Sequence, residues 1–136
     1  NRGLSGIDGT IATARGIALS AGGSGASGVT RVLLGDLAFL HDVGSLMSEP
    51  DIEDTSSVHL FIANDGGGTI FDGLEVSHSA APESRDRVLY TPQNVDIEAL
   101  AGAYGWDYRA VTTMGELADA LVARDLKVIV DIALER

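Results

Sequence analysis

The stretch "VHLFIANDGGGTIF", residues 58–71, joins an apolar run to a polar, glycine-rich loop. Apart from His59, its first six residues are apolar and include β-branched and aromatic side chains, a pattern typical of a buried strand. Asn64-Asp65 ends the run and three glycines, 66–68, follow. Because glycine loses more backbone freedom on folding than other residues, such a run indicates a tight turn or the close approach of another group. We therefore predict a binding loop.

A second apolar run ends in a similar way. Residues 29–34 form a predicted strand that closes with Gly35-Asp36. The interval to Asp65 has room for a crossover helix and one strand, so a right-handed connection would make the two strands neighbours or near neighbours. In open parallel sheets, ligands bind at the carboxyl ends of the strands. Both strand ends are thus expected to face one site.

The rest of the chain alternates between helical and strand patterns. Residues 72–95 lack periodicity and read as a surface segment, and 48–57 as an acidic loop. The predicted helices cover 7–21, 37–47, 96–105 and 113–124, and the predicted strands cover 29–34, 58–63, 106–111 and 126–134. This order predicts an α/β fold, a three-layer Rossmann-like domain with a mainly parallel sheet covered by helices. Asp8 and Asp96 are the expected first caps of their helices, and Gly105 is expected to end the third.

Length and composition narrow the classes of function. The 136 residues suit a single domain, 1–136. The net charge of −11 opposes the phosphate backbone of nucleic acids, so no nucleic-acid partner is expected. No apolar stretch reaches membrane-spanning length, so no stable membrane insertion is expected. Without cysteines, thiolate metal sites and a Cys nucleophile are excluded. The start, Asn1-Arg2-Gly3, lacks an initiator Met and suggests a piece of a longer protein.

The two strand ends offer oxygen ligands. A carboxylate, a second side-chain oxygen and a glycine carbonyl suit Mg²⁺ or Ca²⁺ better than zinc. Mg²⁺ usually keeps few protein ligands and shares the others with phosphate oxygens and water, so we predict a cation that bridges the protein to a diphosphate. Glycine backbone and the start of the helix near Leu37 could help to neutralise the phosphate. The structural alternative is that Asp36 only caps the next helix and the glycines only turn the chain.

The segments "GDLAFLHD" (35–42) and "NDGGGTIF" (64–71) resemble the thiamine-diphosphate-binding motif. Within that superfamily the closest likeness is to SEPHCHC synthase (2-succinyl-5-enolpyruvyl-6-hydroxy-3-cyclohexene-1-carboxylate synthase) of menaquinone biosynthesis. "NRGLSGIDG" (1–9) and "TPQNVDIEALAGAYG" (91–105) extend the likeness over most of the chain. The resemblance implies the C-terminal, diphosphate- and Mg²⁺-binding domain of a three-domain enzyme.

The resemblance also implies an activity. Family members are cytoplasmic transferases that use thiamine diphosphate and Mg²⁺, with Mn²⁺ as a possible substitute. They decarboxylate 2-oxoglutarate and add the succinyl-semialdehyde unit to isochorismate. The glutamate that activates the cofactor is expected in a domain this chain lacks, so the isolated chain is predicted to be inactive. The parent protein is expected to be a homodimer or homotetramer.

Particular residues take family roles by position. Asp36 would be a Mg²⁺ ligand. Counting from Ile70-Phe71 makes Asp65 the second ligand and Gly67 the carbonyl donor, whereas counting from the motif's Asn gives Asn64 and Gly66; we prefer the first register, because it needs no gap. The other cofactor-binding predictions are Ser5, Ile7, Gly35 and Leu37, and the substrate-binding predictions are Arg2, Phe71 and Leu74.

Two other classes of function stay open from the sequence. One is another thiamine-diphosphate enzyme of the acetolactate synthase or decarboxylase type, against which the "NRGLSGIDG" start argues. The other is a non-catalytic α/β module that binds a nucleotide or a partner protein.

Overall fold

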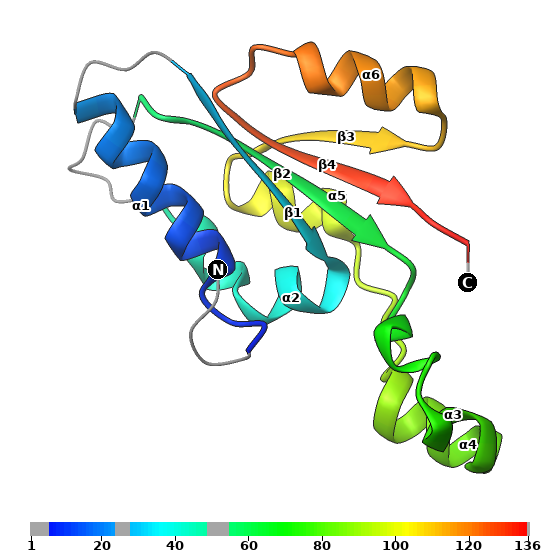
Figure 1. The fold of residues 1–136 in the computed structure, drawn as a ribbon. Coiled ribbons are helices and arrows are strands. Elements are labelled where there is room, and N and C mark those ends of the chain that lie inside the picture. The colour runs from blue at the N-terminus through cyan, green and yellow to red at the C-terminus, as the bar shows by residue number, and fades with distance from the viewer. Residues whose placement is uncertain (1–5, 24–27, 49–54, 136) are drawn as a thin grey trace.

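The computed structural model describes residues 6–23, 28–48 and 55–135. Its centre is a four-stranded parallel sheet in the order β1-β2-β4-β3 (Figure 1). The strands are β1 (Val29–Gly35), β2 (Ser57–Asn64), β3 (Asp107–Val111) and β4 (Lys127–Ala133). The predicted α/β fold with a parallel sheet is confirmed.

Helices lie on both faces of this sheet, as Figure 1 shows. The longer ones are α1 (Thr10–Gly23), α2 (Asp36–His41), α5 (Ile97–Ala103) and α6 (Met114–Val122). α1, α2 and α5 pack on one face around a core that includes Leu60 and Ile129, whereas α6 packs on the other face against Phe61 and Val130. Successive residues of β2 thus enter opposite layers, as strand geometry requires. On the face that α6 covers, Leu33 of β1 is still 73% exposed.

The unpatterned segment after β2 contains short helical turns instead of an irregular loop. They are a 3₁₀ turn (Thr69–Phe71), α3 (Glu75–Ser79), α4 (Pro82–Arg85) and a π-helical turn (Asp86–Tyr90). In Figure 1 this excursion projects from the carboxyl end of the sheet. The sequence pattern did not indicate these turns, because helices of three to five residues are too short to produce a periodic pattern.

Asp42 explains two further differences from the sequence prediction. Its Oδ2 accepts hydrogen bonds from the backbone N–H groups of Ile11 (2.6 Å) and Ala12 (3.0 Å), and its Oδ1 accepts from the Ser45 hydroxyl. The start of α1 is therefore capped from a distant part of the chain, and Asp8 is not the cap. The helix predicted over 37–47 breaks at this same residue into α2 and a 3₁₀ turn, Val43–Leu46.

The other predicted helix ends agree with the structure. The Asp96 side chain accepts from the Ala99 N–H at 2.9 Å and caps α5, and Gly105, at a φ of 73°, follows its last turn. No helix in the described part of the chain has the length and apolar character needed to cross a membrane.

Candidate functional site

The ends of β1 and β2 lie next to one another at the carboxyl edge of the sheet. The two strands are parallel partners, and Gly35 pairs with Ala63 in the register. Asp36 begins α2 directly after β1, and Asn64 is the last residue of β2. The sequence prediction that these two strands are neighbours is confirmed.

Asp36 is a buried carboxylate, 1% exposed. Its Oδ1 accepts from the backbone N–H of Leu37 at 2.8 Å, and its Oδ2 accepts from the Gln93 side-chain amide at 2.6 Å. Gly35 holds the cap position of α2 without a side-chain bond, so Asp36 is not the cap. The ion pairs among the described residues, Arg85–Asp86 and Arg109–Asp125, leave it out. A buried carboxylate held by uncharged donors alone is costly, and a cation would offset that cost.

The side-chain oxygen of Asn64 accepts two hydrogen bonds, and its amide nitrogen donates one. Its Oδ1 accepts from the Gly66 N–H (3.3 Å) and from Gln93 Nε2 (3.2 Å), and its Nδ2 donates to Asp131 Oδ1 (3.1 Å). Asp131, on β4, also accepts at Oδ2 from the Tyr108 hydroxyl at 3.1 Å. Burial first, and then the negative charge of Asp131, raise the pKa of Tyr108 to about 12. Since an amide oxygen has two lone pairs, Asn64 has no acceptor capacity left for a metal in this arrangement.

Asp65 keeps more acceptor capacity. One of its carboxylate oxygens, Oδ2, accepts from the Thr69 hydroxyl, and its backbone carbonyl accepts from the Tyr90 hydroxyl at 2.9 Å. Among the described residues, no hydrogen bond reaches Oδ1. A half-buried carboxylate with a free oxygen beside the β2 end can still bind a cation.

The three glycines of the loop differ in what they require. Gly66 has a φ of 77°, which favours glycine, and its carbonyl accepts from the Gln93 N–H at 3.0 Å. A Cβ on Gly67 would lie 2.6 Å from the Tyr90 carbonyl oxygen, and a Cβ on Gly68 would lie 2.6 Å from that of Leu89. The close approach predicted for this loop is therefore made by the chain's own π-helical turn.

Gly35 presents the opposite situation. A Cβ there would meet nothing within 4 Å, although the residue lies at the end of a strand. Its backbone is extended, with φ −78° and ψ 163°, and it leaves open space beside the buried Asp36. Gly35 is exposed, so this space opens to solvent at the end of the strand.

The remaining predicted residues lie at different places. Leu37 is partly buried in the first turn of α2, and Ile7, before α1, is 44% exposed. Phe71 and Leu74, on the excursion after the glycine loop, are 41% and 47% exposed. Arg2 and Ser5 lie outside the described residues. The structure thus brings Gly35, Asp36 and the loop together. Phe71 adjoins the loop, because its backbone N–H donates to the Gly68 carbonyl at 3.2 Å and its ring lies beside Gly68. Among the described residues, no hydrogen bond joins Ile7 or Leu74 to this group.

Sequence reasoning missed Gln93 and Asp131. Gln93 is 57 positions from Asp36, and Asp131 is 67 positions from Asn64. No local pattern links residues so far apart. The only signal was the likeness of "TPQNVDIEALAGAYG" to the family, which includes Gln93 but gives it no role.

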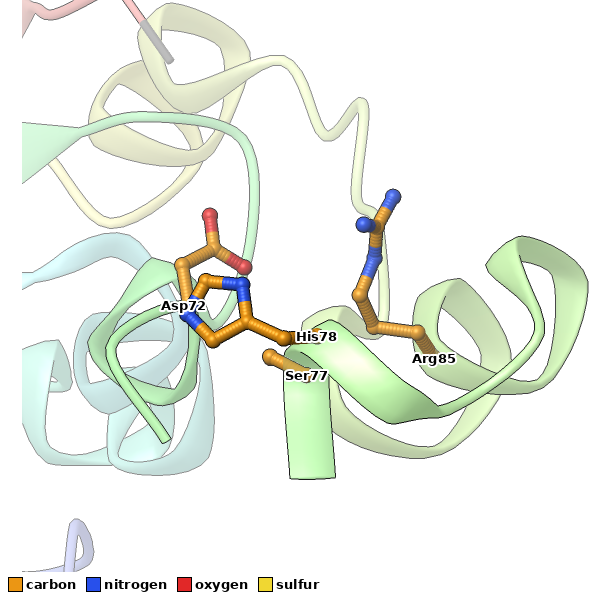
Figure 2. Close-up of a pocket in the computed structure, with 4 residues that line it drawn as sticks. All are labelled: Asp72, Ser77, His78 and Arg85. Carbon is orange, nitrogen blue, oxygen red and sulfur yellow. The ribbon is translucent and has the colours of Figure 1, made fainter. Parts of the chain in front are cut away.

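A pocket lies beside the excursion, lined by Asp72, Ser77, His78 and Arg85 (Figure 2). Ser77 is buried, and its hydroxyl donates to the Phe71 carbonyl at 2.8 Å, so it holds α3 against the preceding turn. His78 is exposed, and Arg85 is paired with its neighbour Asp86 at 3.3 Å. The opposite charges in this pocket favour no single charge of ligand.

The strand-end site, which comprises Gly35, Asp36 and the loop 64–68, suits a hard cation with few protein ligands. In the described part of the chain, no three His, Cys, Asp or Glu side chains gather as a complete metal cage. The oxygen atoms of Asp36, Asp65 and the Gly67 carbonyl, the last of which accepts from no described residue, are of the hard type that Mg²⁺ prefers. A site with so few protein ligands leaves other metal positions for water or phosphate oxygens.

Comparison with solved structures identifies the class of fold. The chain superposes on a benzoylformate decarboxylase from Polynucleobacter necessarius with a TM-score of 0.69 at 24% identity, over 90% of this chain and 22% of that one. It superposes on a thiamine diphosphate-dependent 4-hydroxybenzoylformate decarboxylase from Rhodococcus jostii with a TM-score of 0.67 at 20% identity, over 93% and 23%. The chain therefore has the fold of one domain of these decarboxylases.

Sequence comparison gives the particular relatives, although no family model matches. The chain is 52% identical to the SEPHCHC synthase of Clavibacter michiganensis, over 100% of this chain and 24% of the relative. It is 57% identical to that of Leifsonia xyli, over 90% and 22%. The chain is thus homologous to part of the SEPHCHC synthases, which confirms the resemblance, and it spans about a quarter of their length.

Proposed function

We propose that the chain is the diphosphate- and metal-binding domain of a thiamine-diphosphate-dependent SEPHCHC synthase. The observation that carries this proposal is the buried Asp36 carboxylate, held by uncharged donors next to the open space at Gly35. The relatives' identity of 52% and 57% favours this enzyme over the benzoylformate decarboxylases, which share 24% or less and support the fold alone.

The residues present fit a magnesium ion. Asp36, Asp65 and the Gly67 carbonyl supply the oxygen donors that Mg²⁺ and Mn²⁺ prefer. Asp65 is favoured over Asn64 because Asn64 Oδ1 already accepts two hydrogen bonds. Gly67 is favoured over Gly66 for a similar reason, since the Gly66 carbonyl accepts from Gln93 and no described residue donates to that of Gly67.

The other predicted residues would take the remaining roles that the resemblance implies. Gly35 and Leu37 would lie against the diphosphate, with Ser5 at the same end of the cofactor. Ile7 would support the cofactor's bent form, and Phe71 and Leu74 would line the substrate side. Arg2 would bind a substrate carboxylate, for which a guanidinium gives two parallel hydrogen bonds.

Thiamine diphosphate, when bound, supplies the carbanion stabilisation that decarboxylation of a 2-oxo acid needs. This chain would anchor the diphosphate end of the cofactor, and the remaining three quarters of the parent would supply the rest of the site. The proposed substrates, 2-oxoglutarate and isochorismate, the cytoplasmic location and a dimeric or tetrameric parent follow from the resemblance.

Calorimetric titration with thiamine diphosphate, with and without Mg²⁺, tests the proposal. We expect binding that needs Mg²⁺, that Asp36→Ala abolishes, and that Asp119→Ala, at an exposed acid on α6, leaves unchanged. Equal affinity of the wild-type and Asp36→Ala chains would refute the proposed site.

A further inference from the structure

Gln93 makes a set of contacts that all converge on the strand-end site. It lies between the π-helical turn and α5 and is partly buried. Its Nε2 donates to Asp36 Oδ2 at 2.6 Å and to Asn64 Oδ1 at 3.2 Å, and its backbone N–H donates to the Gly66 carbonyl at 3.0 Å. One residue therefore connects the end of β1, the end of β2 and the glycine loop.

The orientation of this side chain is fixed at both ends. Gln93 Oε1 accepts from the Val95 N–H at 2.9 Å, so the NH₂ group must face Asp36 and Asn64. Asn64 is oriented in turn, because its Nδ2 donates to Asp131 and its Oδ1 accepts from Gly66. Turning over either amide would place donors against donors or oxygen against oxygen.

The lack of charge on the Gln93 side chain matters as much as its geometry. A carboxamide donates hydrogen bonds without a formal charge, so Asp36 is held in place while its negative charge remains available. An ammonium or guanidinium at the same position would form an ion pair with Asp36 and compete with a cation. An apolar side chain would leave a buried carboxylate oxygen without its donor.

We propose that Gln93 is a positioning residue for the metal site, which holds Asp36 and the glycine loop in a cation-binding arrangement without neutralising the carboxylate. This inference rests on the proposed function, since it assumes that Asp36 binds a divalent cation. Residues that orient metal ligands typically contribute tenfold to a hundredfold in metal affinity.

The test is a titration of the 136-residue chain with Mn²⁺ alone, in which the electron paramagnetic resonance signal of the free ion measures how much Mn²⁺ is bound. We expect Gln93→Ala to weaken Mn²⁺ binding by about tenfold or more. Asn94→Ala is the matched control, because Asn94 is the exposed next residue. Gln93→Lys tests the charge argument and is expected to stay folded by circular dichroism while it loses Mn²⁺ binding, since its ammonium would pair with Asp36.

Each outcome separates this inference from the function on which it rests. If Asp36→Ala abolishes Mn²⁺ binding while Gln93→Ala and Gln93→Lys bind as the wild-type chain does, the proposed site stands and the role of Gln93 is refuted. If Gln93→Ala lowers thermal stability with an unchanged dissociation constant for Mn²⁺, Gln93 is only structural. If the wild-type chain binds no Mn²⁺, or Asp36→Ala binds it equally well, the metal site itself is wrong and the inference with it.

Discussion

Replacing Gly67 with alanine should destabilise the fold through a steric clash. The new Cβ would lie 2.6 Å from the Tyr90 carbonyl oxygen and 2.7 Å from Tyr90 Cε2, where contacts of about 3.5 Å are normal between carbons. Tyr90 cannot withdraw freely, because its carbonyl accepts from the Gly68 N–H at 2.6 Å. Gly67 is not among the residues with positive φ, so the penalty would come from packing and not from the backbone.

The expected cost follows from these contacts. Overpacking costs about 1–3 kcal/mol, and weakening the Gly68 hydrogen bond adds about 1 kcal/mol. Alanine also restricts the unfolded chain, which offsets about 0.4–1 kcal/mol of this cost, so the free energy of unfolding should fall by roughly 1–3.6 kcal/mol. Gly35→Ala is the control: its Cβ meets nothing within 4 Å, so we expect unchanged or slightly higher stability.

Urea denaturation followed by Trp106 fluorescence measures both variants. Trp106 is the single tryptophan, 4% exposed, and its indole N–H donates to the Leu46 carbonyl at 3.0 Å, so its emission should report the loss of the core. A Gly67→Ala chain within about 0.5 kcal/mol of wild type would refute the packing argument, as that is the range of an ordinary surface substitution. Equal destabilisation by Gly35→Ala would do the same.

The remaining predictions concern the rest of the molecule. Thr113→Ala removes a capping box with Glu116 at the start of α6 and should cost about 1 kcal/mol in the same urea assay. Ile129→Ala empties a fully buried position and should cost about 2–5 kcal/mol; a smaller loss would place Ile129 outside the main core. Because the pKa of Tyr108 rises from 10.0 to about 12, its contribution to stability should be complete below pH 10 and be lost as the pH approaches 12. In a titration of tyrosine absorbance, Asp131→Asn should lower that pKa, and an unchanged curve would contradict the assignment. The isolated chain should show no turnover of 2-oxoglutarate with isochorismate, and measurable product would overturn that expectation.

The parts of the fold that the sequence predicts are those with local signals. β1, β2 and β4 are short, mainly apolar runs, and β3 alternates between polar and apolar residues. The longer helices repeat apolar residues every three or four positions. Gly35 at the end of β1 and the glycines after β2 locate the carboxyl edge of the sheet, which is why Asp36 and the 64–68 loop could be predicted to lie close together.

The parts that the sequence does not predict depend on contacts between distant residues. Asp42 caps α1 from about 30 positions away, and Gln93 reaches Asp36 across 57. The roles of the three glycines also required the structure, since only Gly66 needs its positive φ while Gly67 and Gly68 are constrained by the turn that contains Tyr90.

The central claim is that the ends of β1 and β2 form one site for a diphosphate and a divalent cation. Backbone amide NMR spectra of the ¹⁵N-labelled chain, recorded as Mg²⁺ and thiamine diphosphate are added together, test it most directly. We predict that the largest shifts fall on Gly35–Leu37 and Asn64–Gly68 and that they require both additions. Shifts that centre on α6, or that thiamine diphosphate produces equally without Mg²⁺, would contradict the claim.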